Sequence, residues 1–374
     1  MPILGIKLDN ILAFNDFSIN FSYPKKLKNS LVSDECLSDI ASFRYKKINV
    51  ILGSNASGKT SLIRCMWFTI LFLNRKEKNI LDNIVNKNNK DSYIEIDYTD
   101  EFEDKNYIYR VKMKIINNLE KVDVAYKRIA LSSNSSYESL VKKLDKAKYI
   151  YKDYIVALNE INNSLGWNVA LPATEASFDR IFFKNVSEEK EDEYLSIVNR
   201  VFKVLDPSIA SINKSKDSDD AYVIEHDLVE KIIVQEGMPI SNLDKLSSGT
   251  KYGFNIANII YSIKNQLNGI YFIDEQFSYV NSNVEKAFIS LISTILNGDE
   301  QVFITIHNPD ILDLNLPFHS FYFMKKIKSD NNTNIECNCA SEIENRNNVS
   351  PKTIIDNDYF GICPDVNKLL EIGE

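Results

Sequence analysis

The sequence lacks long apolar runs and an even set of cysteines. Its most apolar stretch, residues 65–73, is about half as long as a membrane span must be. No secretory leader pattern opens the chain, and its five cysteines form no even disulfide framework. We therefore expect a reduced, cytoplasmic protein that does not span a membrane.

An excess of positive charge is also absent, since 44 Lys and Arg face 52 Asp and Glu, for a formal net charge of -8. Any nucleic-acid surface must then be local. Two basic segments qualify, the second interleaved with tyrosines: Lys25, Lys26 and Lys28, and Lys142, Lys143, Lys146 and Lys148 with Tyr149, Tyr151 and Tyr154. DNA or RNA binding is one interpretation. A solvated basic helix face is the other, and the pattern favours it.

Patterns that bind metals through Cys and His are scarce. Cys337 and Cys339 form C-x-C rather than the C-x-x-C of a zinc knuckle, so two ordinary cysteines on a strand or loop are favoured over a metal site. Among only three histidines, His226 and His319 stand in no motif, and we expect both to be structural.

Continuous apolar runs predict the core of an α/β fold. Residues 47–52, 269–274 and 301–306 are typical of parallel strands covered on both faces. Residues 284–297 read as a helix between the last two, which gives a β–α–β order.

Alternating patterns predict a second, antiparallel sheet. Residues 93–98 and 107–115 alternate with period two around an acidic turn, and a third strand is expected near 122–130. Residues 3–22 predict two short strands, while 137–205 read mainly as helical. We expect four segments: a first lobe with the antiparallel sheet (1–135), a helical insertion or lid (136–240), a second lobe (241–327) and a C-terminal extension (328–374).

The most specific motif is G-x-x-x-x-G-K-T after a predicted strand and before a predicted helix. Backbone amides of such a loop surround phosphates, Lys59 would reach the β- and γ-phosphates, and Thr60 would ligate Mg²⁺. The predicted nucleotide-binding residues here are Gly53, Ser54, Asn55, Ala56, Ser57, Gly58, Lys59, Thr60 and Ser61.

Three weaker motifs follow in order. Ser247 and Gly249 lie in L-S-S-G at the start of a predicted helix, which alone indicates only a helix cap. An apolar strand ends in Asp274 and Glu275, suited to the Mg²⁺ shell and to polarising the attacking water. His307 ends the next strand.

With these residues the chain resembles the ABC ATPases of the SMC, RecF and OLD group. In that pattern L-S-S-G stands for the signature L-S-G-G-Q, His307 for the switch histidine, and Ser278 and Asn281 for the D-loop, with Asn in place of Asp. The resemblance implies an α/β ABC-ATPase head with a mostly parallel core sheet, an antiparallel side sheet and a helical insertion. It also implies two ATP–Mg²⁺ sites closed in a homodimer or higher even oligomer.

Three departures qualify the resemblance. No Gln precedes Gln235, so the Q-loop glutamine is missing. Fewer than about 200 residues separate the phosphate loop from the signature, too few for a long paired coiled coil. No nuclease domain is evident after His307, so a destructive activity would reside on a separate effector protein.

Several functions stay open at this point. The resemblance favours an ATPase that controls a nucleic-acid-directed process or a separate effector, in the manner of bacterial anti-phage systems. A slow-turnover scaffold that holds a partner and a RecF-like DNA repair ATPase are the alternatives. A transporter subunit is disfavoured, because it would normally keep the Q-loop glutamine.

Overall fold

The computed structural model describes residues 2–24, 32, 34–88, 90–161, 186–218, 221–228, 231–235, 246–278, 280–328, 333–343, 352–353 and 357, and the backbone of 167–170. The basic residues Lys25, Lys26 and Lys28 lie outside this set, as does Cys363. Within the described residues, no helix is long and apolar enough to cross a membrane.

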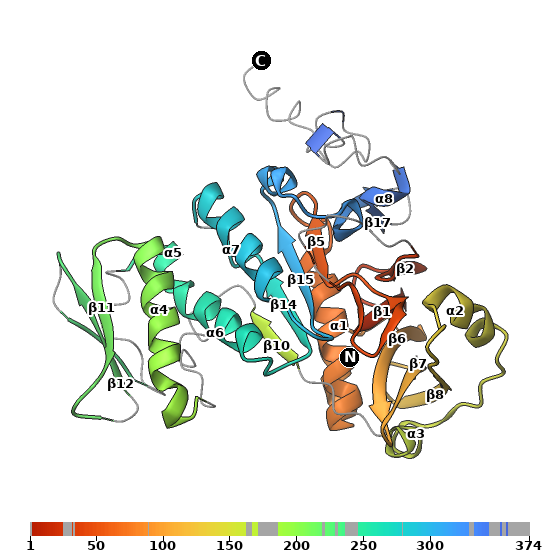
Figure 1. Cartoon of the computed structure of the whole chain (residues 1–374). Coiled ribbons are helices and arrows are strands. Elements are labelled where there is room, and N and C mark those ends of the chain that lie inside the picture. The colour runs from red at the N-terminus through yellow and green to blue at the C-terminus, as the bar shows by residue number, and fades with distance from the viewer. Residues whose placement is uncertain are drawn as a thin grey trace.

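A six-stranded sheet forms the centre of the molecule (Figure 1). Neighbouring strands are parallel except at the β16–β17 edge. The predicted central strands are confirmed, and β5, β14 and β15 are buried along their whole length. In sheet order the strands are β10 (Trp167–Ala170), β14 (Ile270–Asp274), β15 (Gln301–Ile306), β5 (Ile48–Leu52), β16 (Phe321–Lys328) and β17 (Thr333–Cys339).

Helices cover both faces of the central sheet. On one face α1 (Lys59–Arg75) packs between it and the side sheet, in a core that includes Phe272 and Phe303. On the other face α6 (Gly253–Lys264) and α7 (Ser282–Ile295) pack against Tyr271 and Ile304. Successive side chains of the central strands thus point into opposite cores, which explains why these strands are largely apolar.

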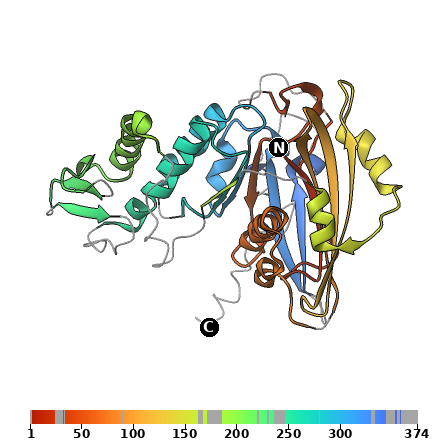
Figure 2. The ribbon, with the colours of Figure 1, turned by 90° about the horizontal axis from the view of Figure 1, so that it is seen from below.

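The expected antiparallel side sheet is present and has six strands. Its apolar face shares a core with α1 (Figure 2). Two helices, α2 (Tyr137–Asp145) and α3 (Tyr154–Glu160), pack against this sheet. In sheet order the strands are β2 (Phe17–Asn20), β1 (Ile3–Asp9), β6 (Ser92–Phe102), β7 (Lys105–Ile116), β8 (Lys121–Ala130) and β9 (Lys152–Asp153).

The expected helical insertion contains helices and also a small sheet. Helix α4 (Glu191–Leu205) packs on α6, where a Cβ at Gly253 would lie 2.9 Å from the Phe202 ring. A three-stranded antiparallel sheet covers the other side of α4 (Figure 1). It consists of β11 (Ile209–Lys214), β12 (Ala221–His226) and β13 (Ile232–Gln235). The division of the chain at 135, 240 and 327 stays a prediction.

The remaining elements are short. They are β3 (Cys36–Leu37), β4 (Ile40–Arg44), α5 (Ser248–Lys251), α8 (Ala340–Ile343) and 3-10 helices at Lys78–Asn83, Glu188–Lys190, Pro309–Asp313 and Phe318–Ser320.

Candidate active site

The phosphate loop connects β5 to α1 and fits tightly against the edge strands. A Cβ at Gly53 would lie 2.3 Å from the Met324 carbonyl oxygen, so no side chain fits there. Gly58 has φ 106°, a left-handed conformation that favours glycine, and a Cβ there would lie 2.5 Å from Ile335 Cδ1. The two glycines of the motif are therefore required by this packing as well as by the turn.

Lys59 is buried inside the loop that it ends. Its ammonium donates to the carbonyl oxygens of Gly53 (2.8 Å) and Ser54 (3.1 Å). Burial lowers the pKa of Lys59, and the nearby carboxylates of Glu275 and Asp274 partly oppose this shift. A cation is thus held within the loop by two of the loop's own carbonyl oxygens.

Asp274 ends β14 beside the first turn of α1. The hydroxyls of Thr60 (3.2 Å) and Thr305 both donate to its Oδ1, and the sheet register pairs Asp274 with Thr305. Oδ2 is buried and has no hydrogen-bond partner among the described residues. Burial raises the pKa of Asp274. A buried carboxylate with a spare oxygen next to a hydroxyl matches the oxygen ligands that Mg²⁺ takes, so these residues fit that ion.

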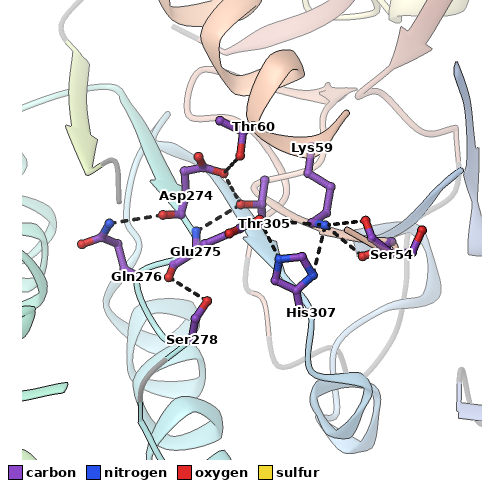
Figure 3. A network of polar contacts seen from close by, with 10 residues as sticks. Ser54, Lys59, Thr60, Asp274, Glu275, Gln276, Ser278, Thr305 and His307 are labelled. Carbon is purple, nitrogen blue, oxygen red and sulfur yellow. Dashed lines mark hydrogen bonds and ion pairs between the residues drawn. The ribbon is translucent and has the colours of Figure 1, made fainter. Parts of the chain in front are cut away.

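Glu275 and His307 meet in front of Lys59 (Figure 3). His307 Nε2 lies 2.7 Å from Glu275 Oε1, and its Nδ1 lies 3.2 Å from Lys59 Nζ. Because the ammonium can only donate, Nδ1 accepts and Nε2 carries the proton, so the neutral imidazole satisfies both contacts. Glu275 Oε1 is also 3.9 Å from Lys59 Nζ.

The backbone of Glu275 is held in an unusual conformation. Its φ is 53°, in the left-handed region that costs energy for a non-glycine residue. The amide of Glu275 donates to both the carbonyl oxygen (3.2 Å) and the hydroxyl (3.1 Å) of Thr305. Thr305 thus supports the two acids at once, through the Asp274 side chain and the Glu275 backbone.

A protein-family model described as an AAA domain matches residues 6–247, more than half of the chain. The chain belongs to this AAA-domain family. No curated protein matches the sequence.

A solved structure shows that the fold is that of an SMC head domain. The SMC head bound to the C-winged helix domain of ScpA aligns over 92% of this chain and 100% of its own, with TM-score 0.52 and 12% identity. The SMC head domain from Thermotoga maritima aligns over 90% of this chain and 98% of its own, with TM-score 0.43 and 14% identity.

The predicted signature residues of this AAA-family chain lie away from its own phosphate loop. In Figure 1, α7 lies between α5 and the start of α1. Ser247 is exposed and caps α5, since its hydroxyl accepts from the Thr250 amide at 3.1 Å. Gly249 is buried within α5. The side chains of the phosphate loop, the acid pair and His307 converge, whereas this motif stands apart.

The predicted D-loop residues hold the chain between β14 and α7. The Ser278 hydroxyl donates to the Glu275 carbonyl oxygen at 2.9 Å. Asn281 caps α7 by accepting from the Asn283 amide at 2.9 Å.

The remaining predicted residues of the phosphate loop differ in burial. Asn55 and Ala56 are exposed, and Ser61 is half-buried. The Ser57 hydroxyl is buried and has no hydrogen-bond partner in the described structure.

The sequence interpretation overlooked Thr305 and Gln276. Thr305 is a polar residue near the end of a fully buried and largely apolar strand, and that mismatch was the available signal. Gln276 stands where the family pattern D-E-P-T has Pro, and its side chain is completely buried.

Within the described part of the chain, the cysteines and the other histidines have no contact with these site residues. Cys339 is the buried last residue of β17, and its Sγ lies 3.3 Å from Lys46 Nζ. His319 Nε2 contacts Glu35 Oε2 at 2.8 Å, also in the interior. No cluster of three Cys, His, Asp or Glu suited to a metal occurs within the ranges that the structure describes.

Proposed function

We propose that this chain binds ATP with Mg²⁺ at the phosphate loop and hydrolyses it. The observation that carries the proposal is the convergence of Lys59, Asp274, Glu275 and His307, from separate elements, onto one loop. Lys59 neutralises phosphate charge, while Thr60 and Asp274 would hold Mg²⁺. That ion, when bound, would neutralise charge on the phosphate oxygens.

Binding and hydrolysis follow from the contacts of Lys59. A phosphate competes with the Gly53 and Ser54 carbonyls, and with Glu275, for the Lys59 ammonium. When the Lys59 ammonium binds phosphate, it no longer contacts Glu275. The Glu275 carboxylate can then accept a proton from the attacking water. His307, which donates to Glu275 through Nε2, then holds that carboxylate in place and leaves Nδ1 as an acceptor.

We further propose that the site is completed by a second copy of the chain. Ser247 is exposed and caps α5, which lies apart from the start of α1 in Figure 1. The predicted signature of a chain is therefore not placed to contact a phosphate bound at the same chain's loop. A two-fold axis brings each Ser247 to the other copy's γ-phosphate. Hydrolysis at either site then removes a ligand that joins the subunits, so the chain works as a homodimer or higher even oligomer.

The closed form is proposed to control a nucleic-acid-directed process or a separate effector, in anti-phage defence. Lys142, Lys143, Lys146 and Lys148 are all exposed around the end of α2, and none forms an ion pair with the residues described. Exposed Tyr151 lies beside them. Such a surface suits a phosphate backbone. The SMC head that this chain resembles was solved with a ScpA domain bound, which supports a protein partner for this chain.

A slow-turnover scaffold is the second candidate. The absence of Gln before Gln235 favours it, because that residue couples Mg²⁺ to the lid in the ABC pattern. Phosphate release by the purified protein, with and without DNA or RNA, separates the two. Turnover that needs Glu275 supports the ATPase, and ATP retained without phosphate release supports the scaffold.

A further inference from the structure

Gln276 links the end of β14 to the signature helix. Its Nε2 donates to the Asp274 carbonyl oxygen at 3.2 Å, and its Oε1 accepts from Asn255 Nδ2 at 3.2 Å. Asn255 belongs to α6, which directly follows the short helix capped by Ser247. In Figure 3 the Gln276 side chain extends away from Lys59, so it does not replace the missing Q-loop glutamine at the phosphates.

This link is tightly confined at both ends. Gln276 is 0% exposed, so neither of its polar groups can exchange its partner for bulk water. At one end, Asp274 is bound through its side chain to Thr60 and Thr305. At the other end, α6 lies so close to α4 that a Cβ at Gly253 would meet the Leu205 side chain at 3.0 Å. A shift of Asp274 is therefore transmitted to α6 as a rigid element.

We propose that Gln276 and Asn255 couple each subunit's own ATP site to the signature that it presents to the other subunit. ATP bound at one site shifts Thr60 and Asp274. The Gln276 side-chain amide transmits this shift to α6 and hence to Ser247. Gln276 is thus a positioning residue that makes the two sites of the dimer cooperative. This inference rests on the proposed composite site, because without it Ser247 would meet no nucleotide.

The test compares Gln276→Met and Asn255→Leu with the parent in ATP-dependent phosphate release. We expect the Hill coefficient, which can reach about 2 with two coupled sites, to fall to about 1 in either variant and to fall no further in the double variant. ATP affinity of the single subunit, measured in the Ser247→Arg background, should stay within about twofold of the parent value, since neither residue faces the phosphates.

Asn258→Leu is the matched control, because Asn258 lies on the same helix and accepts from the Tyr194 hydroxyl at 2.7 Å rather than contacting Gln276. It should keep the parent's cooperativity. Thermal unfolding verifies each fold, and if Gln276→Met does not fold, half-buried Asn255 carries the test. The inference is overturned if the parent protein shows no cooperativity, or if Asn255→Leu keeps the parent's Hill coefficient. It is also overturned if the Asn258→Leu control loses as much cooperativity as the test variants. Failure of the composite site shows separately, as a Glu275→Gln parent that does not associate with ATP.

Discussion

His307 Nε2 and Glu275 Oε1 lie 2.7 Å apart, at the ends of two neighbouring parallel strands, with Lys59 within reach of both. Because parallel strands end at the same edge of a sheet, residues far apart in sequence meet there. The contact supplies Glu275 with a hydrogen-bond donor that holds its carboxylate in place.

Glu275→Gln should keep ATP binding and lower phosphate release at least ~100-fold, because the amide cannot accept a proton from water. Nucleotide affinity by calorimetry and phosphate release in steady state are the two measurements. Exposed Glu138→Gln serves as the matched control. Equal turnover in Glu275→Gln would mean that another residue positions the water.

Thr305→Val should lower the turnover rate by about 10- to 100-fold, the size of losing a hydrogen bond to a charged group. The change keeps the side-chain shape and removes the hydroxyl that contacts both Asp274 and the Glu275 amide. ATP affinity without Mg²⁺ should hardly change. Thr294→Val, which removes a hydroxyl bonded to the Ser290 carbonyl on α7, is the control. If both variants turn over at the parent rate, Thr305 does not support the acids.

Glu285 predicts a pH dependence of stability. It is buried in the first turn of α7 and accepts from Asn308 Nδ2 at 2.7 Å. Burial, assisted by the Asp310 carboxylate, raises its pKa from 4.5 to about 7. The folded chain therefore keeps a proton that the unfolded chain has released. This contribution is fully present below pH 4.5 and is lost as the pH rises through about 7.

Glu285→Gln removes this titration and keeps an acceptor for Asn308. Relative to the variant, the parent should lose up to about 3 kcal/mol of unfolding free energy between pH 4.5 and 7. Denaturant unfolding of both proteins at several pH values measures the difference. A difference that does not vary with pH contradicts the prediction.

The basic surface of α2 should bind nucleic acid if the proposed control function is correct. Replacing Lys142, Lys143, Lys146 and Lys148 with Glu should lower affinity for DNA or RNA and flatten its salt dependence. The charge-matched control replaces four exposed lysines elsewhere, Lys78, Lys87, Lys90 and Lys105. No binding by the parent at low salt, or an equal loss in the control, argues against this surface.

The sequence predicted the elements whose signals are local. The glycines and Lys59 lie within one loop, and the strands before Glu275 and His307 are largely apolar runs typical of a covered parallel sheet. The role of Thr305 could not be predicted, because it depends on a register between strands whose residues lie about 30 positions apart. The Gln276–Asn255 contact likewise depends on how α6 packs.

The last prediction concerns the dimer, and it follows from the separation of α5, which Ser247 caps, from the start of α1 in Figure 1. Neither Lys59→Ala chains nor Ser247→Arg chains can form an intact composite site as homodimers. Lys59→Ala chains lack the lysine that binds the phosphates. Ser247→Arg chains present a bulky cation where a small hydroxyl should contact the γ-phosphate. In a mixture, the phosphate loop of the second faces the signature of the first, which restores one site per heterodimer.

Closure is the appropriate measurement, because a single restored site need not turn over alone. With Glu275→Gln added to every chain, light scattering should show ATP-dependent association in the mixture and little in either variant alone. Ser133→Arg, at an exposed loop position, is the control and should associate like the parent. If Ser247→Arg chains alone associate with ATP as tightly as the parent, the signature assignment is wrong, and the site is built within one chain.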